Sequence, residues 1–323
     1  MSNGDGKTLD LFKSLPISRV ERRAIHTSTQ MALDPIPEQI AFQHTVLCQT
    51  SLPYRNQGDS VRKWERKQGN VSLLIEAGSA INPVTDEWVE LGLPFGPKPR
   101  LILAHLNAEA LRQGSPVIEV EESLTAFVRR IQDPLKAGKS GPNGYEIGVF
   151  KDQLSRLSTA TIRLAITAGE RAVQVNSHIV EAFDLWFAKD ERQRVLWPST
   201  IRLDDKYFAS LQKHAIPLDE RALAALSHSA MALDIYTWLA HRLHRIPPGK
   251  PQFISWISLK EQFGQGYGRM NNFRARFLTA LQQVICQYRE VRLEESLRGI
   301  TLFQSPPPVP SRRMVVIKES VDN

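Results

Sequence analysis

Two amides and two arginines lie together near the start of a predicted helix, Met270–Tyr288. The amides are Asn271 and Asn272, and the arginines are Arg274 and Arg276. An amide side chain can form two hydrogen bonds with an adenine edge, and a guanidinium group can bind guanine or phosphate. The opposite face of the helix is apolar at helical spacing, through Phe273, Phe277, Leu281, Val284 and Tyr288. The pattern predicts a helix that packs on one side and reads duplex DNA on the other.

The residues around this helix predict the elements that would position it. An amphipathic helix spans Met231–Arg245, and a strand spans Gln252–Ile257. A small helix follows, with Ser258 as its N-cap and Glu261 as the capping-box partner. Gly264, Gly266 and Gly268 form a turn before the long helix. After it come two strands, Val291–Glu294 and Ile300–Phe303, joined by a loop that holds Arg298 and Gly299. This order is typical of a winged helix-turn-helix.

The charge of this region is one-sided. Between Trp238 and Arg276 there are seven basic residues and one acidic residue, Glu261. Such a surface favours polyanions. The candidate DNA contacts here are Lys260, Arg269, Asn271, Asn272, Arg274, Arg276 and Arg298. An ordinary helical subdomain with a solvated basic face is the structural alternative.

A similar order of elements occurs earlier in the chain. A helix is predicted over Arg100–Arg112, closed by Gly114, and a strand over Val117–Val120. A small helix over Glu121–Ile131, a glycine-rich loop over Lys136–Gly144 and a long helix over Ile147–Leu164 follow. A hairpin then runs through Arg163–Ala168 and Ala172–His178. The candidate DNA contacts in this copy are Arg156, Thr159, Arg163 and Arg171. The fold class predicted is α+β and helix-rich, with two tandem winged-helix domains, small β wings and an inter-domain hairpin.

The remaining segments set the domain boundaries at residues 1–87, 88–216, 217–306 and 307–323. We expect Met1–Leu33 to be a tail and the run after Ser305 to be disordered. The basic cluster of Arg55, Arg62, Lys63, Arg66 and Lys67 could contact phosphate, but a solvated loop is the preferred interpretation. Val71–Ile81 should pack onto the next domain. Ile179–Phe187 and Val195–Leu203 predict the inter-domain hairpin, Asp204–His214 a helix, and Pro217–Asp219 the start of a long helix with Asp219 as N-cap.

Composition favours a nucleic-acid partner. The formal net charge is +7, and the sequence contains no run of eighteen apolar residues and no apolar leader, so we expect a cytoplasmic protein without a membrane partner. Cys48 and Cys286 lack metal-ligand spacing and predict two reduced thiols. No metal or cofactor is expected.

Four runs resemble a known family, the plasmid-encoded RepA replication initiators. They are GLPFGPKPRLIL at Gly92–Leu103, AMALDIYTWLAHRLHR at Ala230–Arg245, ISWISLKEQFG at Ile254–Gly264 and FRARFL at Phe273–Leu278. The resemblance covers roughly Trp88–Pro306. It implies a bacterial protein that binds direct repeats in a plasmid origin, helps to open the duplex, and recruits the host initiator and helicase. It also implies a role in copy control and leaves a homodimer possible.

Two other functions compete with this one. A winged-helix transcriptional regulator without a replication role would use the same residues. A rolling-circle nickase would need paired metal-binding histidines and a nucleophilic tyrosine, for which His241, His244 and Tyr236 or Tyr267 are a poor match. The glycines at Gly264–Gly268 are not followed by Lys-Ser or Lys-Thr, so no phosphate-binding P-loop is predicted. The sequence therefore favours a binding protein over an enzyme.

Overall fold

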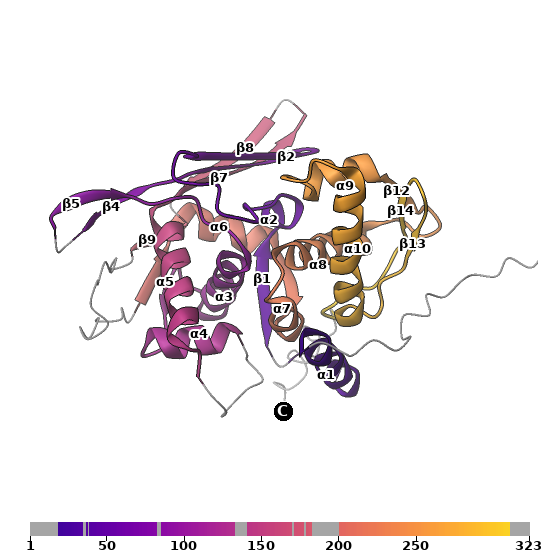
Figure 1. Cartoon of the computed structure of the whole chain (residues 1–323), viewed down its shortest axis with the longest axis horizontal. Helices are drawn as coiled ribbons and strands as arrows, with labels where there is room; N and C mark the ends of the chain where they lie inside the picture. The colour runs from indigo at the N-terminus through magenta and orange to yellow at the C-terminus, as the bar shows by residue number, and fades with distance from the viewer. Residues whose placement is uncertain are drawn as a thin grey trace, which may run out of the picture.

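The fold is α+β, as expected, with packed helices and small antiparallel sheets (Figure 1). The computed structural model describes residues 19–34, 37, 39–82, 85–132, 141–169, 171–177, 179–182 and 200–310. Within these ranges every helix is too short or too polar to cross a membrane. The tail expected after Ser305 lies partly outside them, from residue 311 onward.

The N-terminal elements are part of the packed structure. They are α1 (Arg19–Leu33), β1 (Ile40–His44) and α2 (Thr45–Gln49). The prediction of a tail over Met1–Leu33 is therefore wrong from Arg19 onward. Gln287 near the chain's other end donates a hydrogen bond to the carbonyl of Ala24 in α1 at 3.0 Å, and Ala24 is buried. Burial of one face of α1 against distant helices explains why a polar sequence forms an ordered helix here.

A four-stranded antiparallel sheet joins the N-terminal segment to the middle of the chain. Its order is β2-β3-β7-β8, from Lys63–Gln68, Val71–Glu76, Thr161–Ala168 and Arg171–Ser177. The alternating Val71, Leu73 and Ile75 are buried, which confirms that this apolar stretch packs onto the following segment. The hairpin β4 (Ser79–Asn82) with β5 (Glu87–Glu90) extends to one side (Figure 1).

Three helices and a short strand lie beside this sheet. They are α3 (Pro97–Gln113), β6 (Val117–Glu119), α4 (Leu124–Gln132) and α5 (Gly144–Thr159). Gly114 ends α3 in the left-handed conformation, with φ of 66°. The long helix predicted over Ile147–Leu164 ends earlier, at Thr159, because the β-branched and apolar residues that follow pair with β3. Arg163 thus lies in a strand.

The two copies share their order of elements but differ in strand pairing. The predicted hairpin β7–β8 forms, but it pairs with β3, whereas β6 pairs with β10 (Thr200–Leu203). β10 also pairs with β9 (Val180–Ala182), as the inter-domain hairpin requires. The rest of that hairpin, residues 183–199, lies outside the described residues. We refer to β2–α6 as the first unit.

The connection to the C-terminal half differs from the prediction. α6 (Asp205–His214) is as expected, but Pro217 and Leu218 belong to β11 (Ala215–Asp219), which pairs antiparallel with β1. The helix that follows, α7 (Glu220–Leu226), is short, so no long helix begins at Pro217. The carboxylate of Asp219 accepts a hydrogen bond from the Arg221 amide at 2.9 Å, which confirms Asp219 as N-cap.

The C-terminal half, called the second unit, follows the predicted order. It contains α8 (Ala230–Arg242), a 3₁₀ turn η1 (Leu243–Arg245), β12 (Gln252–Ser255), α9 (Trp256–Phe263), α10 (Met270–Gln287), β13 (Leu293–Glu295) and β14 (Gly299–Leu302). The strands pair in the order β12-β14-β13. One boundary was wrong: Ser255, rather than Ser258, caps α9, through a bond from the Ser258 amide to the Ser255 hydroxyl at 3.1 Å. Ser258 therefore forms no capping box with Glu261.

A buried ion pair joins the units. Arg100 on α3 donates to both carboxylate oxygens of Asp234 on α8, at 2.6 and 2.8 Å, and neither side chain is more than 9% exposed. Arg100 also donates to the carbonyls of Gly96 and Leu52, at 2.6 and 2.7 Å. The pair lies inside a hydrophobic core that runs through both units. Removal of one partner would leave an uncompensated buried charge, which is strongly destabilising.

Candidate nucleic-acid interface

The outer face of α10 is exposed and polar. Phe273, Phe277, Leu281 and Val284 are at most 3% exposed, since their spacing places them on the side that faces the core. Asn271, Asn272, Ala275, Thr279 and Gln282 all face solvent, as the sequence predicted. These short side chains leave the helix backbone accessible to a base edge.

Three predicted arginines on this side of the second unit keep their guanidinium groups available. Arg269, Arg276 and Arg298 are exposed, and none forms a side-chain hydrogen bond or ion pair within the described part of the chain. Arg298 lies in the turn between β13 and β14. That turn is closed by bonds between the hydroxyl of Ser296 and the amide and carbonyl of Gly299, at 3.2 and 3.0 Å.

Two other predicted contacts have partners of their own. Arg274 donates to Glu295 on β13 at 2.7 Å, and its guanidinium lies 4.9 Å from the centre of the Trp256 ring. Lys260 donates to the carbonyl of Gly268 at 3.1 Å, across the turn that precedes α10. These two side chains connect the hairpin and the turn to the helices.

The predicted contacts of the first unit do not form a comparable surface. Arg156 is only 13% exposed, and its Nε atom lies 2.9 Å from Asp152. Arg163 forms an ion pair with Glu76 on β3, and the Thr159 hydroxyl bonds to the carbonyl of Ser155. The side chain of Arg171 lies outside the described residues. The Arg156 guanidinium also lies 5.3 Å from the centre of the Phe95 ring. α5 and α10 stand at opposite sides of the molecule (Figure 1).

In the basic cluster of the N-terminal segment, some side chains bind other parts of the protein and others are exposed. Arg62 donates to the carbonyls of Leu91, Ala77 and Gly78, and Arg66 donates to those of Glu261 and Gln262, both at 2.7 Å. The last carbonyls of a helix lack partners within it, so Arg66 caps α9 from the first unit. The prediction of a solvated loop is wrong for residues 63–67, which form most of β2. Arg55, Lys63 and Lys67 remain exposed.

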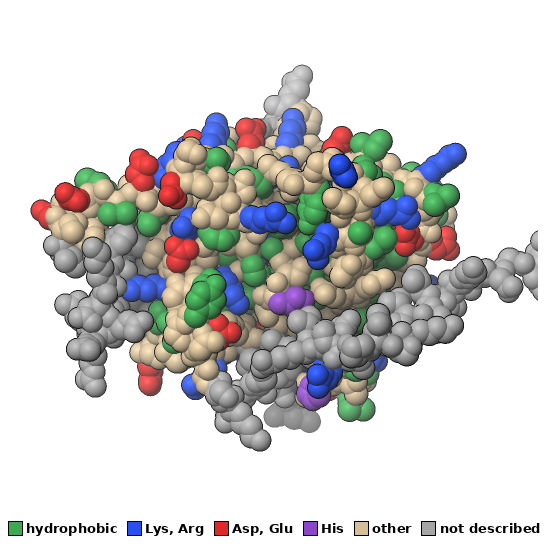
Figure 2. All heavy atoms as spheres, in the orientation of Figure 1, with side chains coloured by type: hydrophobic (Ala, Val, Ile, Leu, Met, Phe, Trp, Pro, Cys, Tyr) green, Lys and Arg blue, Asp and Glu red, His purple; other side chains and the backbone are tan. Residues whose placement is uncertain are grey.

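Basic side chains are visible over the middle of the molecule, where α2 and α8 meet (Figure 2). Acidic side chains gather instead over the β4–β5 hairpin. Acidic side chains are also visible beside β13, so on this face the basic side chains are concentrated along the junction of the two units.

Two of the residues considered for nicking, Tyr236 and His241, have shifted pKa values. Tyr236 is fully buried, its hydroxyl accepts a hydrogen bond from the Asp219 amide at 3.0 Å, and burial raises its pKa. Burial, with the nearby Arg245, lowers the pKa of His241 to about 4. Among the described residues no group of three or more His, Cys, Asp or Glu side chains could hold a metal ion.

Arg100 and Asp234 were not predicted to form a pair. A signal was present, since each is a charged residue within an apolar helical run and buried charges require a partner. The two are 134 positions apart, and they come from two of the runs that carry the family resemblance.

A family profile supports that resemblance. The profile of a family described as plasmid encoded RepA protein matches residues 93–258, just over half of the chain. Two crystal structures of domains 2 and 3 of RctB, one of selenomethionine derivatives, are similar at 11% identity and a TM-score of 0.47. Each covers 80% of this chain, which in turn covers 96% and 94% of theirs. No curated protein matches the sequence.

Proposed function

The chain belongs to the family of plasmid-encoded RepA proteins, and from that premise we propose that it initiates plasmid replication by binding repeated origin sequences. In this proposal the second unit is a winged helix, with α10 as the recognition helix and the β13–β14 hairpin as the wing. The order helix, strand, helix, helix and two strands supports this assignment, as does the pairing of β12 with β14.

One observation carries the proposal. The outer face of α10 presents Asn271 and Asn272 between two arginines, Arg269 and Arg276, that have no side-chain partner in the described ranges. Amides that can reach base edges and guanidinium groups that can reach phosphates are what sequence-specific binding requires. The first unit has the same helix order, but its hairpin belongs to the four-stranded sheet. We therefore assign sequence reading to α10 and a supporting role to the first unit.

Family membership extends the proposal to the whole replication step. The protein would act in the bacterial cytoplasm, promote opening of the origin, recruit the host initiator and helicase, and take part in copy control. It would do so without catalysis or a cofactor, alone or as a homodimer. The second candidate is a transcriptional regulator, because the same surface would serve it. Tandem direct repeats beside an AT-rich tract near the gene favour the initiator, and a lone inverted repeat favours the regulator.

The direct test is the substitution Asn272→Ala. If Asn272 reads a base, binding to the cognate repeat should weaken by about 1–3 kcal/mol, and binding to a scrambled duplex should not change. Fluorescence titration on both duplexes measures this. Gln282→Ala is the control, since this amide is exposed on the same helix about 15 Å further along. Equal losses of affinity for both duplexes would indicate that Asn272 contacts a phosphate. Unchanged affinity for both would indicate that α10 is not part of the interface.

A further inference from the structure

A groove lies between the outer face of α10 and the N-terminal segment that precedes β2. It has a volume of about 530 Å³, within the range of about 300–1,000 Å³ common for ligand sites. One wall is α10, through Arg276, Thr279 and Gln283. The other wall is the segment before β2, through Arg55 and Gln57. The groove therefore lies between parts of the chain more than two hundred residues apart.

The lining of the groove favours an anion. It includes two arginines, Arg55 and Arg276, and no acidic residue among those described. Both arginines are exposed and without a side-chain partner in the described part of the chain. The first turn of α8 also lines the groove, and the positive end of a helix adds to the same attraction.

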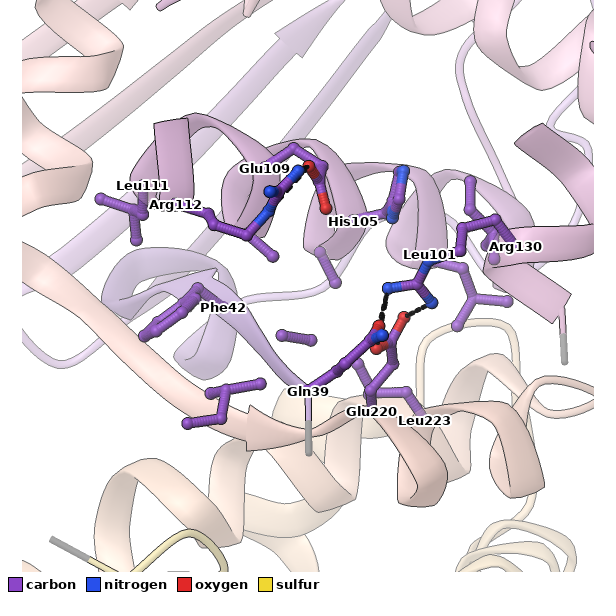
Figure 3. A pocket seen from close by; sticks show the side chains of 15 residues that line it. Gln39, Phe42, Leu101, His105, Glu109, Leu111, Arg112, Arg130, Glu220 and Leu223 are labelled. Carbon is purple, nitrogen blue, oxygen red and sulfur yellow. Dashed lines mark hydrogen bonds and ion pairs between the residues drawn. The ribbon is translucent and has the colours of Figure 1, made fainter. Parts of the chain in front are cut away.

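A second cavity among the described residues has a different lining. It has a volume of about 540 Å³ and lies between α3, α4, α7 and β1 (Figure 3). Its lining includes two carboxylates, and both are engaged: Glu220 with Arg130 at 2.6 Å, and Glu109 with Arg112. Paired charges of both signs do not attract a polyanion as the unpaired arginines do.

The groove continues the face that would read DNA. Asn272, Arg276, Thr279 and Gln283 follow one another at spacings of four, three and four residues, so they share one side of α10. If a base edge of a duplex contacts Asn272, the sugar–phosphate backbone of that duplex must pass along the groove wall that α10 forms. Arg55 stands on the facing wall.

The buried ion pair contacts the residues that precede Arg55. Arg100 holds the carbonyl of Leu52 at 2.7 Å, and its guanidinium lies 5.2 Å from the centre of the Tyr54 ring. The same guanidinium binds Asp234 on α8, which begins at the groove. The segment that carries Arg55 is thus fastened to the second unit by one buried side chain.

We propose that this groove holds a sugar–phosphate strand of the duplex that α10 reads, and that Arg55 is a phosphate contact supplied by the N-terminal segment. The inference rests on the proposed function and extends it to a residue outside the second unit. Affinity for DNA then depends on how the two units are joined, because separate units would not form the groove.

The test is Arg55→Ala in the full chain, with the affinity for cognate and scrambled duplexes measured over a range of salt concentrations. Loss of one phosphate contact should weaken binding by a similar factor on both duplexes and reduce the slope of log affinity against log salt by about 0.9. Arg55→Lys should keep most of the slope. Arg112→Ala, an exposed arginine at the far end of α3, should leave it unchanged.

An unchanged slope in Arg55→Ala, with thermal unfolding as in the natural chain, would overturn the inference. A loss confined to the cognate duplex would do so too, because it would indicate base reading. The proposed function fails separately: in that case the natural chain would not distinguish the two duplexes, or Asn272→Ala would leave both affinities intact.

Discussion

Basic side chains that are close together in the sequence differ in their partners. Arg276 and Arg274 are two residues apart on one helix, yet Arg276 is unpaired within the described ranges and Arg274 binds Glu295. Helical spacing predicted which side of α10 faces solvent, since Phe273 and Phe277 must be buried together. It did not predict ion pairs, because those depend on elements such as β13 that are brought close only by the fold.

His44 is a buried histidine with a hydrogen-bond partner at each ring nitrogen. It is 1% exposed, its Nδ1 atom accepts a hydrogen bond from the Val46 amide at 3.2 Å, and its Nε2 atom bonds to the Ser210 hydroxyl at 3.0 Å. Burial, with a contribution from His214, lowers its pKa from 6.5 to about 3. The unfolded chain therefore takes up a proton that the folded protein does not. The stability contributed by neutral His44 is complete above pH 6.5 and is lost as the pH falls toward 3.

His44→Asn isolates this effect, because asparagine keeps an acceptor for the Val46 amide and does not titrate. The free energy of unfolding of the natural chain should fall relative to the variant by up to about 1.4 kcal/mol per pH unit below pH 6.5. Urea unfolding at pH 7.5 and pH 5 measures the difference. Most carboxylates stay ionised over this interval, and His241 titrates equally in both proteins. Parallel pH profiles would show that His44 can be protonated in the folded state.

Local sequence patterns predicted most helices, but they did not predict the boundaries that depend on pairing between strands far apart in the sequence. Ser258 and Glu261 fit a capping box, yet β12 continues to Ser255 because Ser255 pairs with Gly299 on β14. The chain leaves the sheet at Ser255, so that residue becomes the cap and Ser258 the third residue of the helix. The β7–β8 hairpin was predicted for the same local reasons. The pairing of β7 with β3 was not predicted, because these two strands are far apart in the sequence and meet only in the folded sheet.

The cap gives a prediction for α9. Ser255→Ala removes the acceptor for the Ser258 amide and should destabilise the protein by about 0.5–2 kcal/mol. Ser258→Ala is the matched control. It loses only the hydroxyl contact with Ser255, so its cost should be smaller. Chemical denaturation of both variants decides the question, and a larger cost for Ser258→Ala would restore the boundary inferred from the sequence.

At the scale of the whole molecule, four connections join segments that the sequence divided into separate domains. β1 pairs with β11, Arg66 caps α9, Arg100 binds Asp234, and Gln287 binds α1. Each joins residues far apart in the chain, beyond the reach of periodicity or capping patterns. The order of elements in the second unit could be predicted because its contacts are mostly local.

These connections predict that the units unfold together. Trp238 is 2% exposed and its ring centre lies 5.3 Å from that of Phe263, so Trp238→Ala should destabilise the protein by about 3–5 kcal/mol through the cavity left behind. Because the core is continuous, amide hydrogen exchange should accelerate in α3 and α5 as well as in α8 and α10.

Leu154→Ala in α5 is the reciprocal variant, and it should expose the amides of α10 to the same extent. Faster exchange confined to the second unit in Trp238→Ala, and to the first unit in Leu154→Ala, would show two independent domains. The buried pair of Arg100 and Asp234 would then be a contact between separately folded parts, and the position of Arg55 beside α10 could change without unfolding either one.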